Sequence, residues 1–295
     1  MKKLSYERKK AYYGYLFISV WAVGFVLLFL LPFISSIRYS FSSVSIQQGY
    51  IGLESVGWKN YTDLFTKNTE FLPAFTNTLT SVLVKVPLIL VFSIFVAMVL
   101  NQNFKGRTLA RAIFFLPVII SGGIAIEILN GNYFLSLISS GDRAASMFES
   151  HSVARTLMNS GIPQSAVDYI QGLVNSVFQL VWNSGIQILI FIAGLQSIPS
   201  TLYEVAAVEG SNGWVTFWKV TVPMLAPMLV VNIFYTVVDN MISYSNEMFK
   251  LIDNYTNELK FDSASAMALI NFVVLFIAVF IIYSVGNRYV HYAVD

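Results

Sequence analysis

Long apolar segments without charged residues constrain the fold of this chain more than any other feature. No charged side chain occurs between Ala11 and Ile37, and none occurs between Tyr169 and Tyr203. A helix that crosses a bilayer needs about 20 apolar residues, because the hydrocarbon core is about 30 Å thick. Charged residues make up 12% of the chain, whereas soluble domains contain about a quarter. The sequence therefore predicts an all-α membrane protein.

Six apolar runs are long enough to span a membrane as helices. The first follows the basic segment MKKLSYERKK, as the apolar part of a secretory signal would. It is longer than the usual stretch of about 7–15 residues and no small-x-small cleavage site follows, so we interpret it as a retained anchor. The predicted spans cover residues 13–34, 75–100, 112–130, 172–196, 224–245 and 264–287.

Basic residues indicate the orientation of these spans. Several precede the first span, and lysine and arginine prefer the cytoplasmic side of a membrane. We therefore expect both chain ends in the cytoplasm. Within the core, residues 131–171 are expected to form an extracellular insert and residues 199–223 a cytoplasmic loop. The rest of the layout is a cytoplasmic segment 1–12, an extracellular loop 35–74, a five-helix core 75–290 and a cytoplasmic tail 291–295.

A short polar segment, TLYEVAAVEG, separates two long apolar runs. Thr201 and Glu204 fit the capping-box pattern, in which each side chain binds the backbone amide of the other residue. Gly210 or Gly213 can adopt the left-handed conformation that closes a helix. So short a helix is not stable alone in water and must pack against something. It is either a connector on the membrane surface or a docking element for a cytoplasmic partner.

The segment YEVAAVEGSNGWVTFWKVTVPMLAP resembles the EAA loop of binding-protein-dependent sugar ABC transporter permeases. Val205, Glu209 and Ser211 depart mildly from that pattern. The segment YYGYLFISVWAVGFVLLFLLPFISSIRYSF is similar to the opening of the maltose/lactose-type first permease subunit. The resemblance covers most of the chain and fails mainly in the insert 131–171. The residues that match the loop are Tyr203, Glu204, Ala206, Gly210, Trp214, Phe217 and Pro223.

The resemblance implies a type I ABC importer permease fold with six transmembrane helices. It also implies one membrane subunit of an ATP-driven importer for a carbohydrate, expected to be an oligosaccharide, in a bacterial cell membrane. The implied partners are a second, homologous permease, two ATPase subunits and an extracellular substrate-binding lipoprotein. Glu204 is either only a helix cap or also pairs with a basic residue of the ATPase. The coupling residues implied are Tyr203, Glu204, Ala206, Ala207, Glu209 and Gly210.

The motifs of common enzymes are missing from the sequence. No phosphate-binding loop of the form G-x-x-x-x-G-K-[ST] and no HExxH motif occurs. The chain has no cysteine, and its two histidines, His151 and His291, lie far apart in the sequence. We therefore expect no enzyme activity, no metal site and no cofactor on this chain. ATP and magnesium are expected on the partner ATPase.

Polar residues inside the predicted spans are candidates for a substrate path. Amides and aromatic rings suit a sugar, which offers hydroxyl edges and apolar ring faces. The same side chains could instead join helices through hydrogen bonds, or neutralise one another or the sister permease, and both interpretations stay open. The ionisable candidates are Lys85, Glu127 and Asp239. The candidates on the fourth span are Gln179, Trp182, Asn183 and Gln187, and those on the fifth are Asn232, Tyr235, Asp239 and Ser243.

An ion-coupled secondary carrier is the competing function. Lys85, Glu127 and Asp239 would then form its ion relay. Six spans without an evident internal repeat make this alternative less attractive. The insert 131–171 is expected to pack on the outer face of the membrane and to contact a substrate-binding protein.

Overall fold

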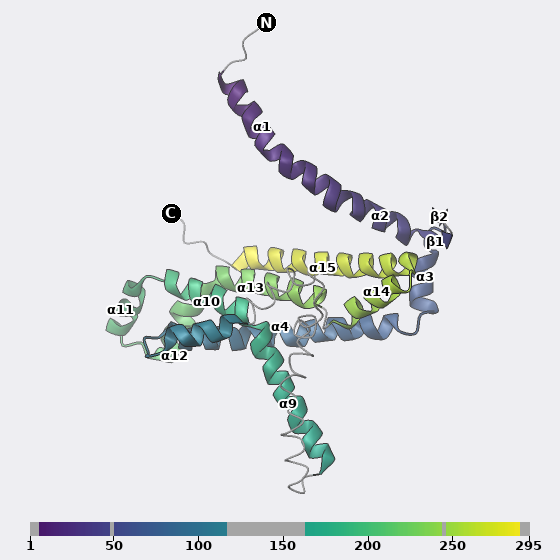
Figure 1. The fold of residues 1–295 in the computed structure, drawn as a ribbon. Coiled ribbons are helices and arrows are strands. Elements are labelled where there is room, and N and C mark those ends of the chain that lie inside the picture. The colour runs from purple at the N-terminus through teal and green to yellow at the C-terminus, as the bar shows by residue number, and fades with distance from the viewer. Residues whose placement is uncertain (1–5, 48–49, 117–162, 244–245, 290–295) are drawn as a thin grey trace. The chain divides into compact units, whose positions relative to one another are not determined.

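The structure is a computed structural model that describes residues 6–47, 50–116, 163–243 and 246–289 (Figure 1). The chain forms two compact units, and each is described by itself. The first unit contains Met1–Phe75 and Lys250–Val273. The second contains Thr76–Phe249 and Val274–Asp295.

The first unit begins with one continuous helix. It consists of α1 (Tyr6–Phe25), a π-helical turn η1 (Val26–Leu30) and α2 (Leu31–Ser40), and the backbone stays helical at both joints. Aromatic rings four residues apart stack along one side of it, because this spacing brings them onto the same face. The helix continues to Ser40, six residues past residue 34, where the sequence predicts that the span ends. The stacked rings are Trp21, Phe25, Phe29 and Phe33.

A β-hairpin follows, which the prediction of an all-α chain did not include. Strand β1 (Ser42–Gln47) pairs antiparallel with β2 (Tyr50–Ser55). Helix α3 (Lys59–Thr66) comes next. The Nδ2 of Asn60 donates hydrogen bonds of 2.9 Å to the carbonyls of Ser40 and Ser42, which joins α3 to the base of the hairpin.

The second unit is built from helices. They are α4 (Phe71–Asn101), α9 (Gln164–Asn183), α10 (Gly185–Ser197), α13 (Val222–Ile242), α14 (Glu247–Asn257) and α15 (Phe261–Tyr289), of which α4, α14 and α15 each extend into the first unit. Helix α10 packs on α13 at Gly194, where a Cβ atom would lie 2.8 Å from side-chain atoms of Leu225 and Met228. One apolar cluster in the core of this unit consists of Val96, Ala97, Leu100, Ile188, Phe191, Ile192, Leu195, Ile198 and Leu225.

The predicted fourth span is not a single straight helix. It is the pair α9 and α10, which bend by 50° at Ser184. The Ser184 hydroxyl donates to the carbonyls of Leu180 and Val181, and such bonds from a serine to its own helix bend the backbone. Gln187 consequently belongs to a different helix from Gln179.

The described residues include four helices that are long and apolar enough to cross a membrane, or five if the bent pair counts as one. A helical stretch at 107–116 begins near the predicted third span, and most of that span lies outside the described residues. The chain is thus a largely helical, multi-pass membrane protein, and the prediction of six spans stays a prediction. The four helices are Gly14–Ser40, Phe71–Asn101, Gly213–Asn257 and Phe261–Arg288.

Candidate functional site: a short exposed helix and a polar pocket

The polar segment predicted to form a helix is α11 (Ser200–Val208). The predicted capping box at its start is wrong. The N-cap position is Pro199, which makes no side-chain hydrogen bond, and Thr201 already lies inside the helix. Proline supplies the extended backbone that precedes a first turn, so the helix begins two residues earlier than a cap at Thr201 would place it. The Glu204 carboxylate is exposed and has no hydrogen bond or ion pair with any residue that the structure describes.

The end of α11 forms as predicted, at Gly210. This residue has φ +76°, and the amide of Ser211 donates to the carbonyl of Ala206 at 2.9 Å. The Gly210 amide donates to the carbonyl of Ala207 at 3.0 Å. Together these two bonds form a Schellman motif, in which glycine is favoured because it has no Cβ. Gly213 instead begins a short helix, α12 (Gly213–Thr216).

The two faces of α11 differ in their surroundings. On the inner face Ala206 is buried and Tyr203 packs against the apolar core of the second unit. The Tyr203 hydroxyl also lies 3.3 Å from that of Thr221, in the π-helical turn η2 (Phe217–Thr221). The outer face is open and apolar. It carries Leu202, Val205 and Val208, and Val208 is 90% exposed.

A polar pocket of about 100 Å³ lies within the second unit. Residues from α4, α9 and the junction of α13 with α14 line it. On α4 the polar residues Asn77, Ser81 and Lys85 are four positions apart and share one face. The Nδ2 of Asn77 donates a 2.8 Å hydrogen bond to Glu247, the first residue of α14. The lining residues are Asn77, Thr78, Ser81, Val82, Lys85, Gln179, Asn183, Asn240, Ser243, Asn246 and Glu247.

Four of the predicted path residues meet in this pocket, namely Lys85, Gln179, Asn183 and Ser243. Sequence reasoning missed Asn77 and Ser81, although their spacing from Lys85 places all three on one helical face. It also missed the residues beyond α13, because no spacing in the sequence shows that this junction returns to α4. The latter residues are Asn246 and Glu247.

Two predicted path residues, Gln187 and Asn232, lie elsewhere and are fully buried between α10 and α13. The Nδ2 of Asn232 donates to the Gln187 carbonyl at 3.2 Å, and the Nε2 of Gln187 donates to Thr236 Oγ1 at 3.2 Å. These bonds join the two helices. The remaining candidates are not among the pocket's lining residues, and Glu127 is outside the described residues. The described candidates that do not line it are Tyr235, Asp239 and Trp182. The ring of Trp182 packs against that of Phe178.

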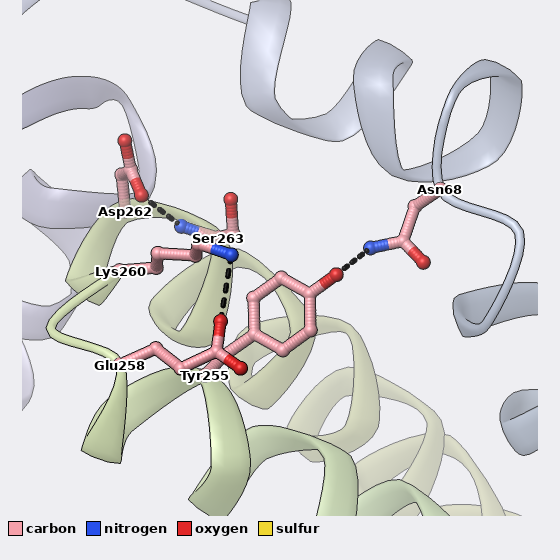
Figure 2. A network of polar contacts seen from close by, with 6 residues as sticks. All are labelled: Asn68, Tyr255, Glu258, Lys260, Asp262 and Ser263. Atoms are coloured by element: carbon pink, nitrogen blue, oxygen red, sulfur yellow. Dashed lines mark hydrogen bonds and ion pairs between the residues drawn. The ribbon is translucent and has the colours of Figure 1, made fainter.

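A second, open pocket of about 620 Å³ lies in the first unit, beside α3 and the start of α15. Figure 2 shows its polar contacts, including a 2.7 Å hydrogen bond from Asn68 Nδ2 to the Tyr255 hydroxyl. The Lys260 ammonium lies 2.6 Å from the Glu258 carboxylate, which raises the pKa of Lys260 above its ordinary value. Charges of both signs line this pocket. Among the residues that the structure describes, no cluster of three or more His, Cys, Asp or Glu side chains could hold a metal ion.

Comparison with known proteins gives many curated relatives, including two that are aligned over more than two thirds of both chains. The chain is 30% identical to the probable ABC transporter permease protein YesP of Bacillus subtilis (strain 168), over 99% of this chain and 96% of that one. It is 32% identical to the arabinooligosaccharides transport system permease protein AraP of the same organism, over 78% of this chain and 68% of that one. No family model matches the chain.

The fold is similar to that of a solved transporter. A crystal structure of a bacterial ABC transporter involved in the import of the acidic polysaccharide alginate matches 96% of this chain and 97% of its own, with TM-score 0.66 and 19% identity. A second structure shows the alginate transporter in complex with a periplasmic protein bound to an alginate pentasaccharide, with TM-score 0.66 and 18% identity. Both match the described fold along nearly its whole length.

Proposed function

This chain belongs to the sugar ABC transporter permeases, and we propose that it forms half of the translocation path of an importer for an oligosaccharide. It is a transport subunit and not an enzyme. The observation that carries the proposal is α11, a short exposed helix in the loop that resembles the EAA loop. The import of oligosaccharides is supported by the likeness to AraP, whose name assigns arabinooligosaccharides to that relative. An ion-coupled carrier has no support, because the relatives are ABC transporter permeases.

The partners follow from the way such permeases work. A substrate-binding protein delivers the sugar, as the complex of the alginate transporter with its periplasmic protein illustrates. We expect this binding protein to be an extracellular lipoprotein. A second, homologous permease would supply the other half of the path. Two ATPase subunits would bind ATP and magnesium on the cytoplasmic side.

In this proposal α11 transmits movement from the ATPase to the membrane helices. Its inner face is fixed to the bundle through Tyr203 and Ala206, whereas its outer face exposes Val205 and Val208. An exposed apolar face on a short helix suits a cleft in a partner protein. Glu204 is exposed beside this face and would pair with a basic residue of the ATPase. Closure of the two ATPases on ATP would then move α11 and open the bundle outward.

The proposed layout keeps both termini in the cytoplasm. Residues 1–12 and 291–295 are then cytoplasmic, and the loop 35–74 with its hairpin is extracellular. The core 75–290 holds five further spans, including one at 112–130, and the cytoplasmic coupling loop 199–223. The insert 131–171 would contact the binding protein, although its last residues belong to α9.

Within that layout the polar pocket is one wall of the sugar path near the outer side. Its amides and hydroxyls both donate and accept hydrogen bonds, as sugar hydroxyls do. Gln179, Asn183 and Ser243 would bind the sugar directly. Gln187 and Asn232 would hold α10 against α13 and would not contact the sugar.

Cross-linking from α11 tests the proposal. The chain has no cysteine, so the variant Ala207→Cys carries a unique thiol on the coupling helix. In membranes that contain the whole importer, a reagent that joins this thiol to any neighbouring residue through a photoreactive group is expected to capture the ATPase subunit. The matched control is Ser55→Cys in the hairpin, which is expected to capture no ATPase and to react with a membrane-impermeant maleimide from outside. Failure of Ala207→Cys to capture an ATPase, or its labelling from outside, contradicts the proposal.

A further inference from the structure

The charges in the polar pocket of the second unit are not equally neutralised. Its described lining contains one cation, Lys85, and one anion, Glu247. The Glu247 carboxylate accepts a 2.8 Å hydrogen bond from Asn77. It is also the first residue of α14, where the partial positive charge of a helix N-terminus stabilises a negative side chain. The acid is therefore compensated inside the protein.

Lys85 has no such compensation from the part of the chain that the structure describes. Its side chain is exposed within the candidate span Phe71–Asn101, and it has no hydrogen bond or ion pair with any residue that the structure describes. An ionised residue inside a membrane span is costly, so it is retained where it binds something. The ammonium offers three donors and no acceptor. Its best partner is an anion.

The chemistry of the remaining lining decides which anion fits. Gln179, Asn183 and Asn240 are neutral amides that both donate and accept, and a neutral sugar needs nothing more. A carboxylate only accepts, and a charge-assisted bond to an ammonium binds it more strongly than a neutral hydrogen bond. We propose that Lys85 binds the carboxylate of an acidic oligosaccharide, one that contains uronic acid residues. This specificity rests on the proposed importer function.

Competing uptake of two matched disaccharides tests this specificity. Digalacturonate and galactobiose, both with the α-1,4 linkage, share ring and linkage, and differ in whether C6 is a carboxylate or a hydroxymethyl group. The complete importer, with its binding protein and ATP, is reconstituted in vesicles. For Lys85→Gln we expect the ratio of digalacturonate to galactobiose uptake to fall by about tenfold or more. Lys85→Arg keeps the charge and is expected to stay within about threefold of the wild type. The binding protein is the same throughout, so its own preference cancels when the ratio of a variant is compared with that of the wild type.

Matched controls separate a binding role from a structural one. Lys105→Gln makes the same change at an exposed lysine outside the pocket and is expected to leave the ratio unchanged. An equal loss of both sugars in Lys85→Gln overturns the proposal, since Lys85 then serves only folding or subunit pairing. An unchanged ratio overturns it too, as does a wild-type importer that transports galactobiose or another neutral oligosaccharide but not digalacturonate. These results leave the importer function standing, whereas absence of ATP-driven uptake for every oligosaccharide would contradict that function itself.

Discussion

The hydroxyl of Thr78 donates a 2.7 Å hydrogen bond to Oδ1 of Asn246, and this bond joins α4 to the start of α14. Both side chains are buried. The same Oδ1 accepts a 2.9 Å bond from the amide of Met248. Asn246 therefore caps α14 and at the same time holds α14 on α4, which fixes one wall of the polar pocket.

The first prediction is that Asn246→Ala destabilises the protein. The substitution removes the nearer acceptor of the Met248 amide, which keeps only a 3.3 Å bond to Thr78 Oγ1, and it leaves the buried Thr78 hydroxyl without the acceptor for its proton. Loss of an N-cap alone costs about 1 kcal/mol of stability, and the buried hydroxyl adds to that cost. The midpoint of thermal unfolding of the detergent-purified protein is expected to fall. Asn246→Asp keeps the acceptor but loses the 3.1 Å bond that Nδ2 donates to the Asn240 carbonyl, so its midpoint is expected to fall less than that of Asn246→Ala.

Asn254→Ala is the control for this prediction, because Asn254 is exposed within the same helix. It is expected to change the unfolding midpoint little. Equal lowering of the unfolding midpoint by Asn246→Ala and Asn254→Ala would show that the Asn246 cap does not stabilise the protein.

The second prediction concerns the turn that ends α11. Gly210 has φ +76°, a conformation that costs an alanine about 1–2 kcal/mol. Gly210→Ala is therefore expected to loosen the end of the helix and to reduce sugar-stimulated ATP hydrolysis by the assembled importer several-fold. Gly210→Asn is expected to reduce it less, because asparagine tolerates this backbone region.

The neighbouring glycine serves as the comparison for that turn. A Cβ at Gly213 would meet nothing within 4 Å, and its φ is not in the left-handed region. Gly213→Ala is thus expected to hydrolyse ATP at nearly the wild-type rate. A reversed order, with Gly213→Ala the more defective, would refute the role of the Gly210 turn.

The third prediction sets two helical glycines against each other. A Cβ at Gly194 would lie 2.8 Å from side-chain atoms of both Leu225 and Met228, so Gly194→Ala must push α10 from α13. Such overpacking costs about 1–3 kcal/mol. A Cβ at Gly172, on α9, meets nothing within 4 Å, and alanine favours a helix over glycine by about 1 kcal/mol.

Thermal unfolding should therefore shift in opposite directions for these two variants. Gly194→Ala is expected to lower the midpoint and Gly172→Ala to raise it or leave it unchanged. Shifts of the same sign and size would show that close packing at Gly194 does not stabilise the bundle.

Local features of this fold could be predicted from the sequence, and features that depend on distant contacts could not. The turn at Gly210 follows from one glycine after a short helix, and the spans follow from apolar runs. The bend at Ser184 was missed, although Asn183, Ser184 and Gly185 are poor helix formers and a Ser-Gly pair is a known site of kinks. The apolar residues on both sides of it continue the same run, which suggested one straight span. The capping box did not form because the helix already begins after Pro199, which places Thr201 inside the first turn. The hairpin carries a weak alternating pattern that could have been noticed.

The same limit explains the mixed outcome for the predicted path residues. Spacing alone puts Gln179, Asn183 and Gln187 on one helical face. The bend between Asn183 and Gln187 separates them. Gln179 and Asn183 line the pocket, whereas Gln187 is buried and hydrogen-bonded to Asn232. Whether a polar residue binds sugar or joins helices thus depends on where the helix breaks.

The last prediction tests this separation directly with two glutamine-to-leucine variants. Gln187 donates to the buried Thr236 hydroxyl, and hydrogen bonds between membrane helices contribute about 1 kcal/mol. Gln187→Leu is therefore expected to lower the unfolding midpoint and to leave the KM of sugar uptake unchanged. Gln179 lines the polar pocket, and a lost contact to substrate is expected to raise that KM about fivefold to tenfold for Gln179→Leu. Its unfolding midpoint should stay near the wild-type value. If Gln187→Leu raised the KM while Gln179→Leu only destabilised the protein, the assignment of one amide to helix packing and the other to the path would be reversed.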